Sequence, residues 1–148
     1  MAFSLSTKGC YAVLLMYQLA QSDGALTSLS EISSAQNISQ GYLEQIVRPL
    51  KEQNLVQSKR GYGGGYRLAK PPDQITIGEI VTISEGPVAP VQCVNNDFSF
   101  CVSPLDCKAR LVWRKVGDAI SSVLNSITLQ DLLELDDSYN LKGENDHG

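Results

Sequence analysis

A glycine-rich segment constrains the fold of this chain more than any other feature of its sequence. The six residues Lys59–Gly64 include three glycines, which is too many for a stable helix. On either side lie short segments with the composition of β-strands, Leu55–Ser58 and Gly65–Leu68. The sequence therefore predicts a β-hairpin with a flexible tip, in a chain whose other regular patterns are helical.

Three helical segments precede this hairpin. Apolar residues recur with helical spacing over residues 7–21, and Ser28–Glu31 has the spacing of a capping box that opens a second helix to about residue 36. Ser39 can cap a third helix. The inward side of that helix is formed by Tyr42, Leu43, Ile46, Val47 and Leu50. Helix, helix, turn, helix and hairpin is the order of a winged helix-turn-helix, in which the third helix enters the major groove of DNA.

The third predicted helix has side chains that suit DNA. Glutamine can pair with adenine, glutamate can accept from the cytosine amino group, and arginine or lysine can bind phosphates. We expect DNA contacts from Ser39, Gln40, Tyr42, Glu44, Gln45, Arg48 and Lys51. The alternative is a solvated helix face without a ligand.

The predicted hairpin tip combines two adjacent cations with glycines. Lys59 and Arg60 supply electrostatic attraction, while glycines allow the backbone to approach a phosphate or a groove. We expect Arg60 to enter the minor groove, with further contacts from Gly61 and Tyr62. A nucleotide-binding phosphate loop would need Lys-Ser/Thr and a helix after the glycines, and neither follows. A tight hairpin without a ligand is the other alternative.

The net charge of −4 is unevenly distributed along the chain. Residues 1–70 contain seven basic and four acidic side chains, a net +3, whereas residues 71–148 contain five basic and twelve acidic side chains, a net −7. Only the first half therefore has a charge that suits a polyanionic partner.

The second half begins with another capping box, Thr76–Glu79, and continues into a polar loop. From Pro104 to about residue 125, apolar residues recur every three or four positions and predict a helix of about 30 Å. Too little chain remains to cover its apolar side, so we expect a partner subunit there. The predicted units are a DNA-binding domain over 1–84, a cysteine-containing sensor loop over 85–103, a dimerisation helix with a short C-terminal helix over 104–135, and a flexible acidic tail over 136–148.

Three of the four cysteines, Cys93, Cys101 and Cys107, lie within fifteen residues. The sequence contains neither a membrane span nor a signal peptide, so we expect a cytoplasmic protein in which metal or redox chemistry explains cysteines better than disulfides do. Three thiolates can converge on one soft metal centre, but structural zinc and iron-sulfur clusters usually take four ligands. Thiols without a metal are the alternative.

Three segments of the sequence carry a family resemblance: Ser6–Val13, Ile38–Gln45 and Leu55–Tyr66. With these segments the sequence resembles the Rrf2-type winged-helix transcription regulators over nearly its whole length, and most closely their iron-sulfur cluster regulator (IscR) branch. The resemblance implies a homodimer on a pseudo-palindromic operator, with the long helix from Pro104 at the subunit interface. It also implies that Glu44 tunes promoter choice, that Arg60 and Gly61 insert into the minor groove, and that the three cysteines bind a 2Fe-2S cluster, with a 4Fe-4S cluster or no cluster as alternatives.

The sequence departs from the resemblance around the cysteines. The first gap has seven residues where the family pattern has five, and the position of a histidine ligand is Arg110, whose protonated guanidinium cannot ligate iron. In a nitric-oxide-sensing branch the partner's first helix supplies a carboxylate, but the matching residue here is Lys8. Cys10, more often a core residue at such a position, and His147 remain candidates for the fourth ligand, as do water, a small thiol or a carboxylate of the other subunit.

We interpret the chain as a homodimeric DNA-binding transcription regulator, with repression as the expected mode, controlled by a cluster on three cysteines. A regulator of the same fold that responds through thiol oxidation, zinc or a protein partner is the first alternative. A redox or electron-transfer protein is the second. No catalytic triad, carboxylate pair or cofactor-binding glycine motif accompanies the thiols, so we do not expect an enzyme.

Overall fold

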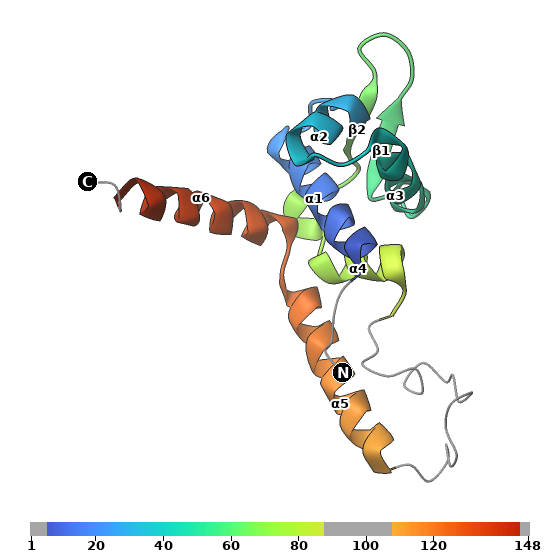
Figure 1. Cartoon of the computed structure of the whole chain (residues 1–148), viewed down its shortest axis with the longest axis vertical. Helices are drawn as coiled ribbons and strands as arrows, with labels where there is room; N and C mark the ends of the chain where they lie inside the picture. The colour runs from blue at the N-terminus through green and yellow to red at the C-terminus, as the bar shows by residue number, and fades with distance from the viewer. Residues whose placement is uncertain (1–5, 88–107, 146–148) are drawn as a thin grey trace.

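The computed structural model describes residues 6–87 and 108–145 (Figure 1). Its elements are α1 (Thr7–Gln21), α2 (Leu29–Gln36), α3 (Gln40–Glu52), β1 (Val56–Lys59), β2 (Gly65–Leu68), a 3-10 turn η1 (Pro72–Gln74), α4 (Ile77–Glu85), α5 (Lys108–Ser126) and α6 (Leu129–Asn145). The predicted fold class, mainly α with a small β-hairpin wing and a long helix behind it, is confirmed. The predicted start of the long helix at Pro104 lies outside the described residues.

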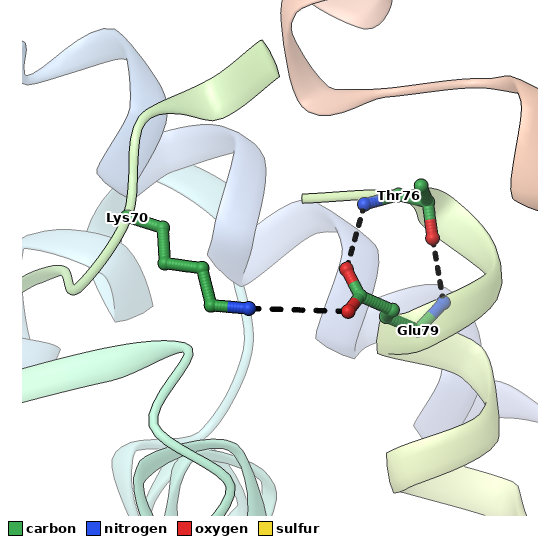
Figure 2. A network of polar contacts seen from close by, with 3 residues as sticks. All are labelled: Lys70, Thr76 and Glu79. Atoms are coloured by element: carbon green, nitrogen blue, oxygen red, sulfur yellow. Dashed lines mark hydrogen bonds and ion pairs between the residues drawn. The ribbon is translucent and has the colours of Figure 1, made fainter. Parts of the chain in front are cut away.

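Side-chain caps begin the helices where the sequence predicts them. Ser28 and Glu31 form a reciprocal capping box with two hydrogen bonds of 3.1 Å, and Thr76 and Glu79 repeat this arrangement with the same distances. Figure 2 shows the second box, together with the Lys70 ammonium 4.0 Å from the Glu79 carboxylate. These contacts satisfy backbone donors that would otherwise have no partner in the first helical turn.

Helix α1 lies at the centre of one hydrophobic core. It contacts α2, α3, α4, α6 and β2, and its buried face includes Leu15 and Met16. Helix α3 contributes the other large share, with four buried residues: Leu43, Ile46, Val47 and Leu50. Four of the five inward residues predicted for the third helix are therefore buried, whereas Tyr42 is half-buried.

The turn between α2 and α3 is held by a left-handed residue and by side-chain hydrogen bonds. Asn37 ends α2 in the left-handed conformation with φ 55°, at the predicted break. The Ser33 hydroxyl donates to the Ile38 carbonyl at 2.6 Å, and the Ile38 side chain is buried. The Ser39 hydroxyl then accepts from the Tyr42 backbone N–H at 3.2 Å and starts α3.

The wing is an antiparallel hairpin that is joined to the helical core. β1 pairs with β2 in the register Val56↔Leu68 to Lys59↔Gly65, so β1 begins one residue later than predicted. Thr27 and Tyr66 exchange two backbone hydrogen bonds of 2.8 Å, which connect β2 to the start of α2. The tip needs glycine at position 64, because a Cβ there would lie 2.2 Å from the Lys59 carbonyl oxygen.

The junction between α5 and α6 is built into the body formed by α1–α4 and the wing. The Ile77 N–H donates to the Ile127 carbonyl at 2.8 Å, and the Leu129 N–H donates to the Ile75 carbonyl at 2.9 Å. Gly78 also allows α4 to pack closely against α5, because a Cβ at position 78 would lie only 1.8 Å from the Asn125 Oδ1. Since the Leu129 side chain is fully buried, the core includes a residue beyond the domain boundary predicted at residue 84.

Helix α6 is longer than the sequence suggested. The prediction was a short helix followed by a flexible tail from residue 136, but α6 continues to Asn145 and projects from the body in a different direction from α5 (Figure 1). Its first half is anchored on α1, where the Tyr17 hydroxyl donates to Asp136. This contact joins residues far apart in sequence, so local composition gave no sign of it.

Candidate nucleic-acid interface

The outward face of α3 has the polar composition predicted for a recognition helix. Gln40, Glu44, Gln45, Arg48 and Lys51 are all exposed. Their positions follow from the helical period, because the intervening apolar residues are directed into the core. The face offers amide, carboxylate and cationic groups to a ligand outside the body.

Two residues expected to contact DNA also have a structural part in α3. Ser39 is exposed, but its hydroxyl is the N-cap of the helix. Tyr42 is half-buried, and its ring meets that of Tyr11 edge-to-face with centroids 5.7 Å apart. Packing against α1 thus explains why Tyr42 is half-buried. Its contact with DNA remains a prediction.

The wing tip presents its predicted residues to solvent. Lys59 ends β1, and Arg60 and Tyr62 follow it with exposed side chains. Gly61 has φ +95°, a conformation that residues with a side chain rarely adopt. The Gly64 N–H donates to the Gly61 carbonyl at 3.0 Å and closes the turn. Tyr62 is fully exposed, so nothing within the described residues explains an aromatic group there.

Helix α3 and the wing border a common hollow of about 310 Å³. Gln40 and Glu44 line it from α3, and Lys59 and Arg60 line it from the wing. Ser28, at the start of α2, completes one side. The structure therefore brings together side chains that the sequence predicts to contact bases and phosphates, although they are about twenty positions apart in the sequence.

A second hollow, of about 510 Å³, lies beside the first. It is lined by Lys51, Asn54, Gln57, Ser58, Lys59 and Arg67, among others. Lys51, Ser58 and Lys59 line both hollows, so the two are adjoining parts of one surface. Arg67 and Gln57 were not among the predicted contact residues, although strand alternation could have placed both on the outer face of the hairpin.

Helix α5 has an uncovered apolar face. Gly117 is its only buried residue in the part of the chain that the structure describes. Its exposed apolar side chains are Leu111 (63%), Val112 (55%), Trp113 (41%), Val116 (39%) and Val123 (58%). Several exposed apolar side chains on one element are typical of an interaction site.

The structure places the sequence candidates for cluster binding only in part. Cys93, Cys101 and Cys107 lie outside the described residues. Cys10 is exposed, so the expectation of core packing at this position is wrong. Lys8 and Arg110 are half-buried, His147 is again outside the described ranges, and residues 6–87 and 108–145 contain no group of three potential metal ligands.

One titratable group in the body is clearly shifted. Burial raises the pKa of Tyr17 to about 12, and its hydrogen bond to Asp136 and the charges of Asp136 and Asp137 act in the same direction. Tyr17 belongs to the contact between α1 and α6 and not to the candidate interface. No helix within residues 6–87 and 108–145 is long and apolar enough to cross a membrane.

Known proteins resemble this chain in sequence and in structure. The sequence pattern of the Rrf2 family, described as iron-dependent transcriptional regulators, matches residues 5–135. The transcriptional regulator CymR of Bacillus subtilis is 40% identical over 134 residues, covering 90% of this chain and 91% of CymR. The regulator IscR of Yersinia pseudotuberculosis is 38% identical over 143 residues, covering 92% of this chain and 86% of IscR.

Solved structures of relatives agree with this similarity. CymR of B. subtilis, described as the global cysteine regulator, superimposes with a TM-score of 0.76 at 39% identity, covering 90% of this chain and 98% of CymR. IscR of T. potens superimposes with a TM-score of 0.72 at 38% identity, covering 90% of this chain and 88% of that structure.

Proposed function

The chain belongs to the Rrf2 family of transcriptional regulators, and from this premise we propose that it is a sequence-specific repressor that binds double-stranded DNA as a homodimer and is controlled through Cys93, Cys101 and Cys107. The observation that carries DNA binding is the hollow shared by α3 and the wing. It combines Gln40 and Glu44 with Lys59 and Arg60. Such a surface offers hydrogen bonds to base edges and attraction for phosphates at the same time.

In the proposed complex, α3 lies in the major groove and the wing tip reaches the adjacent minor groove. Glu44 on α3 accepts from a cytosine amino group and thereby discriminates between sequences. Arg60 follows immediately after β1, and the positive φ of Gly61 turns the chain so that the cation stands at the tip of the hairpin. Its guanidinium is attracted to the strongly negative potential of a narrow minor groove.

The homodimer is supported by the uncovered apolar face of α5. Five large apolar side chains on one helix are 39% to 63% exposed in the single chain. A second copy of α5 would remove this surface from water, at about 25 cal/mol for each Å² buried. Each chain has a head, formed by α1–α4, the wing and the start of α6. Two heads held by one pair of α5 helices would contact two half-sites, so the preferred operator is an inverted repeat.

Control is assigned to the three clustered cysteines, which lie in the sequence between α4 and α5. Their thiolates suit a 2Fe-2S cluster, which would respond to oxidants and to iron supply when bound. The described residues supply no complete ligand group, and position 110 is an arginine, so the fourth ligand would have to come from another source. Through α4, whose Glu85 carboxylate accepts from the Gly9 N–H at 2.9 Å, a change near the cysteines would act on α1 and thus on the head.

A second form of control has its own support. CymR of B. subtilis is described as a global cysteine regulator, and this chain is as similar to it as to IscR proteins. In this alternative the same three thiols respond by oxidation, zinc binding or contact with a protein partner, without a cluster.

Selection of bound duplexes from a random-sequence pool tests the DNA-binding proposal. We expect enrichment of an inverted repeat, a dimer by sedimentation, and tighter binding to the enriched duplex than to a scrambled one. A protein that enriches no sequence would contradict the proposal.

The two forms of control are separated by the visible absorption, iron and sulfide content of protein purified anaerobically. A cluster gives a coloured protein, and we expect Cys93→Ser, Cys101→Ser and Cys107→Ser each to lose the colour. Cys10→Ser shows whether the exposed Cys10 thiol is the fourth ligand, because retained colour would exclude it. A colourless protein without iron, whose DNA affinity changes on thiol oxidation, would favour the alternative.

A further inference from the structure

We propose that the second hollow, centred on Arg67, is a binding site for the DNA phosphate backbone and extends the interface beyond the recognition helix and the wing tip. This inference rests on the proposed function, because its partner is the same duplex. It assigns Arg67 and Lys51 to one phosphodiester strand, bound without regard to base sequence.

The charge of the hollow is the first argument. Three cations, Lys51, Lys59 and Arg67, line it, and its lining includes no carboxylate. Within the described ranges the ion pair between Lys70 and Glu79 is elsewhere, and none of the three lining cations has an acidic partner. Three cations gathered around one hollow repel each other, so an anion there would be bound favourably.

The orientation of Arg67 is the second argument. Arg67 is the cross-strand partner of Gln57, and its Nε donates to the Gln57 Oε1 at 3.2 Å. This contact fixes the plane of the guanidinium on the exposed face of the hairpin and uses only one of its five N–H donors. The remaining donors match the fork geometry with which arginine binds phosphate oxygens.

The shape of duplex DNA is the third argument. The major and minor grooves are separated by a sugar-phosphate strand, so a protein that places α3 in one groove and the wing tip in the next must have that strand over the surface between them. Lys51, Ser58 and Lys59 occupy this surface, since they line both hollows. Arg67 lies on the far side of it, where it would meet the next phosphate along the strand.

The test measures fluorescence anisotropy of the full chain with the duplex enriched by selection and with its scrambled form, over a series of salt concentrations. We expect Arg67→Gln to weaken binding to both duplexes by the same factor, about 3- to 10-fold, and to lower the slope of log affinity against log salt by about 1. Arg67→Lys should retain most of the slope. Lys70→Gln is the matched control, because its ammonium is already paired with Glu79, and it should leave both quantities unchanged.

Several results would overturn the assignment. One is that Arg67→Gln keeps the affinity and the salt slope of the wild type. Another is that Lys70→Gln loses as much DNA affinity as Arg67→Gln does. A third is that Arg67→Gln loses affinity only for the enriched duplex, which would make Arg67 a base-contacting residue. Inorganic phosphate at constant ionic strength separates a free anion from the backbone: Arg67-dependent competition with the duplex would support the backbone site, whereas phosphate binding that leaves DNA affinity unchanged would assign the hollow to the small anion. A wild-type chain that binds neither duplex would instead contradict the proposed function, which distinguishes the two failures.

Discussion

The head and α5 use apolar residues in opposite ways. In the head, formed by α1–α4, the wing and the start of α6, large side chains such as Leu15, Leu43 and Ile46 are fully buried. On α5, side chains of the same kind, such as Leu111 and Val112, are more than half exposed, and Gly117 is the only buried residue of the helix within the described ranges. The head is therefore complete within one chain, while α5 has the composition of half an interface.

This difference predicts which measurement each substitution affects. A change in the core should lower the free energy of unfolding of the head, because the removed atoms leave a cavity. A change on α5 should leave that free energy nearly unaltered and should weaken association between copies. Four substitutions, from the largest expected effect to the smallest, test the contrast.

Ile46→Ala should have the largest effect on the head. Ile46 is fully buried on the inner side of α3, and truncation of such a side chain costs about 2 to 5 kcal/mol. Urea denaturation followed by circular dichroism measures this loss, with exposed Gln45→Ala on the same helix as control. A loss below about 1 kcal/mol would mean that the core beneath α3 is looser than the structure describes.

Gly78→Ala tests the joint between the two regions. The added Cβ would lie 1.8 Å from the Asn125 Oδ1 and 3.1 Å from the Asn125 backbone nitrogen, so α4 and α5 must separate or the asparagine must move. We expect a cost of about 1 to 3 kcal/mol in thermal or urea unfolding. Asn125→Ala in the same chain should recover part of it, and identical costs with and without this second change would contradict the proposed contact.

Tyr17→Phe tests the contact between α1 and α6. Loss of the hydrogen bond to Asp136 should cost about 1 kcal/mol near neutral pH. Because the pKa of Tyr17 is raised in the folded state to about 12 from the ordinary 10.0, its contribution is present below pH 10 and is lost as the pH rises through 12. Between pH 8 and 12, the free energy of unfolding should fall more steeply for the wild type than for Tyr17→Phe. Parallel curves of this free energy against pH would refute the assignment.

Leu111→Ser should have the smallest effect on the head, within about 0.5 kcal/mol, because this side chain is 63% exposed in the single chain. Its effect should be on association, measured by sedimentation over a range of protein concentrations. The same change at exposed Lys115 on α5 is the control for altered helix propensity. Destabilisation of the head by Leu111→Ser, without a shift in dissociation, would remove the distinction between the two regions.

Local patterns in the sequence were sufficient to predict much of the head. The capping residues Ser28 and Thr76 mark helix starts because each acts over only three positions, and glycines define the wing tip for the same reason. The outward residues of α3 follow from helical spacing. Their grouping with Lys59 and Arg60 followed from the order of the elements.

Features that depend on distant contacts were missed. The hydrogen bonds that join Ile75 and Ile77 to the α5–α6 junction link segments about fifty positions apart, and no local pattern announces them. The length of α6 was underestimated because an acidic composition suggests a mobile tail, whereas Tyr17 anchors the helix through Asp136. Cys10 was expected in the core because helical spacing alone does not say how wide the buried face of α1 is.

The buried position of Leu129 has a consequence for how the protein is made. Synthesis releases the chain from its N-terminus, so α1 to α4 emerge from the ribosome well before the residue that completes their core. A nascent chain therefore has no finished head until α5 has also been translated. A product truncated after α4 would lack Leu129 from its core and would be an incomplete fold rather than a smaller regulator.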